Sequence, residues 1–197
     1  MSYWRTLHAF FGSGSTDVAE VRIDASTHAL ESIDYAHHEV HSGSYYFVKG
    51  WADVDGAGTT VDFLWVVPNT TDWPHANWAI DGEAEFTLSL YEDVITSSNG
   101  TAMTVFNANR NSSNTAGVTA YVDPTLDGGA LGDSGTGGTL VWSGKIGSGR
   151  TSTANRRTGY EFIGKQNTKY WFQIEKEAAG THYIDYDFNW YEHTDKD

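Results

Sequence analysis

The sequence predicts an all-β fold, a jelly-roll-like antiparallel β-sandwich preceded by an N-terminal arm. Apolar and polar residues alternate in several segments, which is the pattern of a half-buried strand. The 21 glycines, with frequent Thr, Ser and Asn, supply turns between short strands. No segment shows the sustained 3.6-residue period of a capped helix. About eight strands separated by turns favour a sandwich or a barrel, and we prefer the jelly roll.

The first segment, Met1–Phe11, is rich in aromatic residues and ends at the flexible spacer Gly12-Ser13-Gly14-Ser15. We therefore divide the chain into an arm with its spacer (residues 1–16) and a single β-sandwich domain (residues 17–197). Exposing such an aromatic segment to water is costly, so the arm either docks on its own domain or inserts into a partner. A short helix fits only in the arm or in Thr27–Tyr35.

The clearest alternation lies in Ala84–Leu90, Tyr170–Glu175 and Ile184–Trp190. Each segment is expected to turn its apolar set inward; in the second, Tyr170, Phe172 and Ile174 alternate with outward-facing residues that include Trp171. Further strands are predicted at Ser44–Val54, Thr60–Val67, Val118–Val122, Thr139–Ile146 and Gly159–Lys165, with a weaker one at Ala19–Ile23. Two long loops, Asn107–Gly117 and Asp123–Gly138, are expected to be functional or disordered.

The charge and the cysteine count exclude several classes of function. The formal charge is −14, which disfavours binding to nucleic acid or to an anionic membrane surface. The chain has no cysteine, which removes disulfides and thiol chemistry and fits folding in a reducing cytosol. No run of about 18 apolar residues could span a bilayer, and the N-terminus does not resemble a signal peptide, so we expect no Sec export.

The segment Tyr35–His41 contains the candidate metal ligands His37, Glu39 and His41. On a strand the three side chains would share one face, whereas on a helix only His37 and His41 would pair. The spacing differs from that of zinc proteases, and ordinary hydrogen-bonding histidines explain the segment more simply. We therefore assign no metal site and no cofactor.

Two glycine-containing motifs favour turns over ligand sites. Gly144–Thr151 lacks the lysine and the following helix of a phosphate-binding loop, so a hairpin loop is expected. Asp53-Val54-Asp55-Gly56 lacks the remaining ligands of a calcium loop and fits a tight turn. No nucleophile, base and acid occur in a recognisable catalytic order, so we expect no enzyme activity and no catalytic residue.

The candidate binding residues are the apolar side chains of the arm and a few scattered arginines. Arginine forms bidentate pairs with carboxylates, which suits a contact with another subunit or a partner protein. The predicted partner-binding residues are Trp4, Leu7, Phe10, Phe11, Arg110, Arg150, Arg156 and Arg157.

Four stretches together resemble a family of tailed-bacteriophage virion proteins. They are His37–Tyr46, Asn107–Ser112, Leu126–Gly129 with the glycine-rich loop after it, and Lys165–Tyr170 followed by Asn189–His193. The resemblance covers roughly residues 33–194. It implies a head decoration (cement) protein, commonly a β-rich trimer that binds between capsomers.

That resemblance sets the expected partners and location. The partners would be the major capsid protein and further copies of this chain in a homotrimer, on the capsid exterior of a virion assembled after synthesis in the host bacterial cytoplasm. Two alternatives stay open. One is a tail or fibre component, or a glycan-binding β-sandwich module, that uses exposed aromatic residues and the loop 107–117. The other is a metal-dependent hydrolase that uses His37 and His41.

Overall fold

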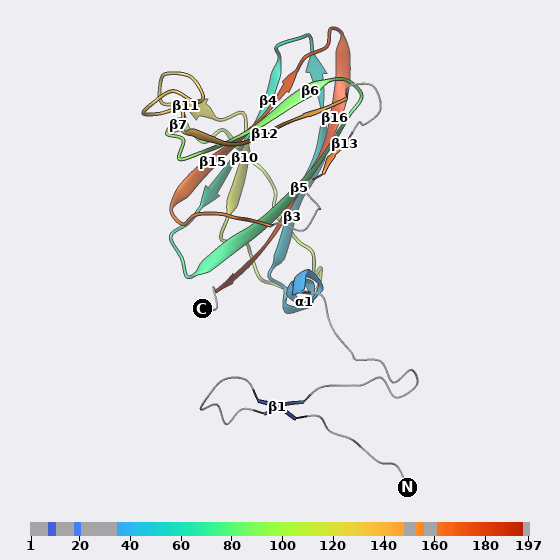
Figure 1. Ribbon diagram of the computed structural model, residues 1–197, viewed down its shortest axis with the longest axis vertical. Helices are drawn as coiled ribbons and strands as arrows, with labels where there is room; N and C mark the ends of the chain where they lie inside the picture. Colours follow the sequence, from blue (N-terminus) through green and yellow to red (C-terminus); the bar gives the residue numbers. More distant parts are fainter. Residues whose placement is uncertain (1–7, 11–17, 21–34, 148–152, 156–160, 195–197) are drawn as a thin grey trace. The chain divides into compact units, whose positions relative to one another are not determined.

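The computed structural model describes residues 8–10, 18–20, 35–147, 153–155 and 161–194 and divides the chain into two compact units, Met1–His38 and Glu39–Asp197 (Figure 1). In the first unit, β1 (His8–Phe10) pairs antiparallel with β2 (Val18–Glu20), with Phe10 opposite Val18. The boundary predicted after residue 16 falls between these two paired strands. The weak strand predicted at 19–23 overlaps β2.

Two large antiparallel sheets build the second unit. The first sheet has the order β13 (Thr153–Asn155), β5 (Asp72–Gly82), β16 (Thr181–Thr194), β3 (Tyr45–Asp55) and β9 (Phe106–Asn107), and β14 (Phe162–Ile163) also pairs with β5. The second has the order β12 (Thr139–Ile146), β6 (Phe86–Glu92), β15 (Thr168–Lys176), β4 (Thr60–Val67), β10 (Thr119–Val122) and β8 (Thr101–Ala102). A small separate sheet joins β7 (Thr96–Ser98) to β11 (Thr125–Leu126).

The connections between these strands follow a jelly roll. The chain crosses from one sheet to the other at β3–β4, β4–β5 and β5–β6. Between β6 and β12, β8 and β10 extend the second sheet, β9 pairs at the edge of the first, and β7 and β11 form the small sheet. The chain then alternates between the sheets through β13 and β14, β15 and β16. Each of these strands pairs antiparallel with its neighbours. The predicted jelly-roll sandwich is therefore confirmed, with β8, β9 and β10 added at the sheet edges.

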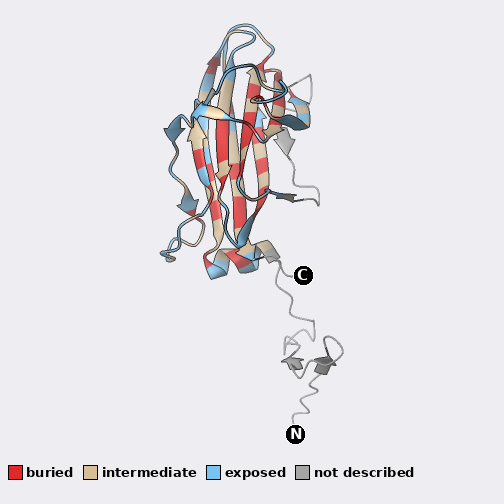
Figure 2. Ribbon diagram, turned by 90° about the vertical axis from the view of Figure 1, so that its left-hand side faces the viewer, coloured by how far each residue is buried: buried red, intermediate tan, exposed pale blue. Residues whose placement is uncertain are grey.

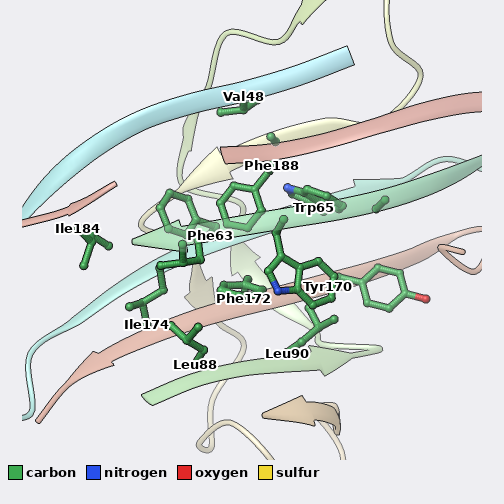
Figure 3. Packing of buried hydrophobic residues seen from close by; sticks show 14 of the residues in the cluster. Val48, Phe63, Trp65, Leu88, Leu90, Tyr170, Phe172, Ile174, Ile184 and Phe188 are labelled. Carbon is green, nitrogen blue, oxygen red and sulfur yellow. The ribbon is translucent and has the colours of Figure 1, made fainter. Parts of the chain in front are cut away.

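The core lies between the two sheets and is dominated by aromatic side chains (Figure 3). Phe63 of β4 meets Phe188 of β16 edge-on, with ring centroids 5.1 Å apart, and Trp65 lies 5.2 Å from Trp190. Buried and exposed residues alternate along the strands, as the period of two requires (Figure 2). The void next to Trp65 measures only ≈ 10 Å³, so it has no space for a small-molecule ligand.

The prediction that Trp171 faces solvent is wrong. Trp171 is 5% exposed and forms a second apolar cluster with Leu64 and Val94 on the outer face of the second sheet. Leu126 and Leu131 of the glycine-rich loop pack on this cluster, so strands β4 and β15 are buried on both faces. The loop predicted to be functional or disordered thus serves as a cover for one face of the sandwich.

The sequence misplaced the helix and missed one central strand. Helix α1 spans Tyr35–Ser42, so it begins where the predicted helix Thr27–Tyr35 ends; residues 21–34 lie outside the described residues. Strand β5 lies inside the first sheet but was not predicted; a proline within a run, here Pro74, argues against assigning a central strand. Of the strand predicted at 159–165, only β14 is present among the described residues.

Candidate functional site

The structure describes only part of the predicted binding set. Trp4, Leu7, Phe11, Arg150, Arg156 and Arg157 lie outside the described residues, and of Phe10 only the strand position is described. Arg110 is exposed, and its guanidinium carbon lies 5.4 Å from the ring centre of Phe106. This stacking keeps the charge at the edge of the first sheet, where a partner can reach it.

The strand geometry that would gather His37, Glu39 and His41 is wrong, because all three lie on helix α1. Residues two apart point to different sides of a helix, so Glu39 does not share the face of the two histidines. The Glu39 carboxylate is buried instead and accepts hydrogen bonds from the hydroxyls of Ser42 and Ser44. Within the described ranges, no group of three or more His, Cys, Asp or Glu side chains is arranged to hold a metal ion.

The polar loop Asn107–Gly117 caps the C-terminus of α1. The Asn107 amide donates to the Gly43 oxygen at 2.8 Å, and the Asn109 amide donates to the His41 oxygen at 3.2 Å. Asn114 adds a third bond, again to the Gly43 oxygen. The last carbonyls of a helix have no partner within the helix, so these amides meet a structural need. In this loop, which was expected to be functional or disordered, the side chains of Asn107, Asn109 and Asn114 therefore have a structural role.

The first glycine-containing motif forms the predicted turn, whereas the strands on either side of the second, β12 and β13, pair with β6 and β5 and so do not form the expected hairpin. Gly56 has a φ of 76° and donates its amide to the Gly180 oxygen, while the Asp55 carboxylate accepts from the Thr181 hydroxyl. Gly147 follows β12 with a φ of 86°, and a Cβ there would lie 1.8 Å from the Ala84 oxygen. Residues 148–152 of the second motif lie outside the described residues.

One face of the sandwich carries most of the exposed apolar side chains. Along β3, β5 and β16 the odd-numbered residues point away from the core, because their even-numbered neighbours are the buried ones. Five of the eight large apolar side chains that are exposed among the described residues lie on this outer face of the first sheet, which we call the open face: Trp51 (66% exposed), Ile163 (48%), Tyr183 (42%), Phe106 (40%) and Trp73 (37%).

One half of the open face is built on a cluster of aromatic rings, of which His75 and Tyr191 are buried. His75 packs against both Tyr191 and His193, with ring centroids 4.7 Å and 4.5 Å away, and those two rings lie 5.5 Å from each other. The Glu161 carboxylate lies 3.1 Å from Nδ1 of His75 and accepts the hydroxyl hydrogen of Tyr191. These contacts fix the orientation of the rings, so they give this half of the open face a rigid support before any partner arrives.

Next to these rings an open groove of ≈ 470 Å³ runs between Trp73 and Ile163. Gln166 lines it and is held on both sides: its amide nitrogen donates to the Asp72 oxygen, and its oxygen accepts from the Thr70 amide. The Lys165 ammonium lies 3.0 Å from Asp93, which raises its pKa. The groove therefore offers apolar contact area with a fixed polar rim.

The other half of the open face combines two aromatic side chains with carboxylates. Trp51 of β3 lies directly opposite Asp185 of β16, and Tyr183 lies directly opposite Asp53. The four exposed residues form a checkerboard, which we call the Trp51–Tyr183 platform. Beside it, Lys49 pairs with Asp187 at 3.6 Å. An uneven distribution of charge thus divides the open face into an aromatic half and an acidic half.

A polar groove of ≈ 540 Å³ near the start of β3 is mainly structural. The Glu192 carboxylate there accepts hydrogen bonds from the amides of Gly117 and Val118 and from the indole of Trp190. Burial, together with the nearby Glu192 and Asp72 carboxylates, raises the pKa of Tyr46. These bonds anchor the end of the loop 107–117 to β16 and leave the carboxylate little capacity for a ligand.

Comparisons with family models, with curated proteins and with solved structures give no match to this chain. No helix within the described residues is long and apolar enough to cross a bilayer. The open face is therefore the feature on which a functional assignment rests. Sequence reasoning missed it, although β3 and β16 carry aromatic residues at both odd and even positions, which is the signal for a strand with two apolar faces.

Proposed function

We propose that this protein is a non-catalytic structural component of a tailed-bacteriophage particle, a head decoration protein that attaches to the capsid through its open face. The observation that carries the proposal is the difference between the two outer faces of the sandwich. Leu126 and Leu131 cover the second sheet, while the first sheet exposes Trp51, Trp73 and Ile163. Exposed apolar patches of this kind typically mark protein–protein contacts.

The resemblance of four sequence stretches to phage virion proteins supports the choice of partner. In this proposal the protein forms homotrimers on the capsid exterior, after synthesis in the host cytoplasm. An oligomer would attach through several open faces at once, so modest single contacts would add up to firm attachment. The aromatic arm and its residues Trp4, Leu7 and Phe11 belong to the proposal as a second contact.

The test is co-sedimentation of purified protein with undecorated capsids. The double variant Trp73→Ser/Ile163→Ser changes the open face, and its matched control, Leu140→Ser/Val141→Ser, changes equally exposed residues on β12 of the other sheet. We expect the first variant to lose attachment by about tenfold or more and the control to keep it. Absence of wild-type binding, or equal binding by both variants, would refute the proposal. Deleting Met1–Phe11 measures the arm's share.

A glycan-binding module is the second candidate function, because a flat ring as exposed as that of Trp51 can stack on a sugar. A glycan array separates the two functions. Selective binding to one class of sugar that Trp51→Leu abolishes would favour the glycan module over the decoration protein.

A further inference from the structure

We propose that the Trp51–Tyr183 platform binds arginine or lysine side chains of a basic segment on the partner protein. The inference deepens the proposed function and rests on it for the nature of the partner as a protein. The four residues of the platform, Trp51, Asp53, Tyr183 and Asp185, come from two adjacent strands whose backbone pairing sets their positions.

The geometry of the platform suits a cation. Side chains directly opposite each other on antiparallel strands have Cβ atoms about 4.5–5.5 Å apart, so each ring has a carboxylate beside it. A guanidinium over the indole of Trp51 would lie within about 6 Å of the ring centre, the range of a cation–π contact. From there it can also donate paired hydrogen bonds to Asp185. Ring and carboxylate therefore recognise the same group.

The open face already holds a guanidinium in this manner at its aromatic end. Arg110 lies over the ring of Phe106, 5.4 Å from the ring centre. The platform presents Trp51, a better ring for such contacts and a more exposed one, and adds carboxylates that Phe106 does not have beside it in the described strands. The platform thus offers a ring and carboxylates to a guanidinium from outside, whereas Phe106 already binds the guanidinium of Arg110 in the same chain.

Charge complementarity favours a basic protein segment over a neutral ligand. Asp53 and Asp185 place two negative charges on the platform, and Glu83 lies close by, because its carboxylate accepts from the Tyr183 amide at 3.4 Å. Among the described residues, the lysine nearest in strand register is Lys49, which pairs with Asp187. With a net charge of −14, the whole chain attracts cationic partners and repels anionic ones.

The experiment uses the full chain and a short arginine–glycine peptide as the probe. The control peptide has citrulline in place of each arginine, which keeps the shape and several donors but removes the charge. Binding is followed by NMR on the indole N–H signals of the eight tryptophans, with Trp51 assigned from the Trp51→Leu variant. We expect the arginine peptide to shift the Trp51 signal, the citrulline peptide not to shift it, and high salt to weaken the binding.

Two variants test the two parts of the platform. Trp51→Leu keeps an apolar side chain but removes the ring face, and we expect it to weaken peptide binding by about two- to fivefold. Asp53→Asn/Asp185→Asn should remove most of the salt dependence. Trp73→Leu, at the other end of the open face, is the matched control and should bind like the wild type.

Equal binding of the citrulline peptide would overturn the inference, as would stronger shifts of Trp51 with the neutral oligosaccharide maltohexaose. Running the same platform variants in the capsid assay separates the two proposals. Attachment that is lost in Trp73→Ser/Ile163→Ser but unchanged in the platform variants would sink the inference and leave the decoration function standing. Peptide binding at the platform without any capsid attachment would refute the decoration function and leave the binding of basic side chains supported.

Discussion

The side-chain amide of Asn107 donates a hydrogen bond to the main-chain oxygen of Gly43 at 2.8 Å, across 64 positions of sequence. The Gly43 amide bonds to the Val40 oxygen, and the Ser44 amide bonds to the Glu39 oxygen, so α1 ends in a Schellman motif with Gly43 at a φ of 79°. A Cβ at Gly43 would lie 2.3 Å from the Ser112 hydroxyl oxygen. The loop thus fits closely over the end of the helix.

We expect Asn107→Ala to lower the free energy of unfolding by about 1–3 kcal/mol, because it leaves the buried Gly43 oxygen and the Asn109 amide without the Asn107 side chain. Urea unfolding measures the effect. Asn111→Ala, an exposed change in the same loop, is the matched control and should stay within about 0.5 kcal/mol of the wild type. Equal stabilities for the two variants would contradict the capping role.

The cover over the second sheet gives a second prediction. Leu126→Ala/Leu131→Ala should destabilise the protein by about 2–4 kcal/mol, because it removes packing from the cluster around Trp171. Leu140→Ala, at a half-exposed position on β12, should cost much less. Urea unfolding of the three proteins tests this, and a loss no larger than that of Leu140→Ala would mean that the glycine-rich loop does not stabilise the sheet.

Tyr170 makes the stability sensitive to alkaline pH. Burial raises the pKa of its phenol above the ordinary value of 10.0, and the hydrogen bond to Glu92 acts in the same direction. Burial also raises the pKa values of Tyr46 and Tyr186. Because the folded state keeps these protons while the unfolded state releases them, the stabilising effect is complete below pH 10.0 and is lost as the pH rises further.

The measurement is urea unfolding at a series of pH values on both sides of the ordinary tyrosine pKa. Stability should fall with rising pH in the wild type, and the fall should be shallower in Tyr170→Phe, which has one fewer shifted phenol. Tyr183→Phe, at an exposed position on the open face, should keep the slope of the wild type. If the fall of stability with rising pH were equally steep in Tyr170→Phe, the buried Tyr170 phenol would not be a source of the alkaline sensitivity.

Strand composition and the turn residues between strands made part of the fold predictable. Strands β4 (Thr60–Val67) and β12 (Thr139–Ile146) have the bounds that the sequence predicts, because each is a short run rich in β-branched and aromatic residues and turn residues follow it. Strand β5 was missed although its even-numbered residues alternate as buried positions, because Pro74 near its start argues against a central strand. Pro74 is tolerated where it lies: its oxygen still accepts from the Gly164 amide, so the strand keeps that bond.

The helix and the open face depend on contacts that are distant in sequence. Helix α1 has only eight residues. The side-chain amides of Asn107, Asn109 and Asn114 cap its end, and these residues are too far from the helix in sequence for a local pattern to predict the contact. The open face arises because Trp51 and Tyr183 lie at odd positions of strands whose even positions fill the core. Predicting strands from alternation assumes that the solvent-facing residues are polar, so it does not identify exposed aromatic residues such as Trp51 and Tyr183.

The covered second sheet has a consequence for how copies of the protein would build up on a surface. A molecule attached by its open face would turn the glycine-rich loop outward, and Leu126 and Leu131 of this loop already pack against the sheet, so they have little area left for a second molecule. Deposition would then stop after a single layer. The amount bound would plateau at the number of available places on the support, instead of growing with the supply of free protein.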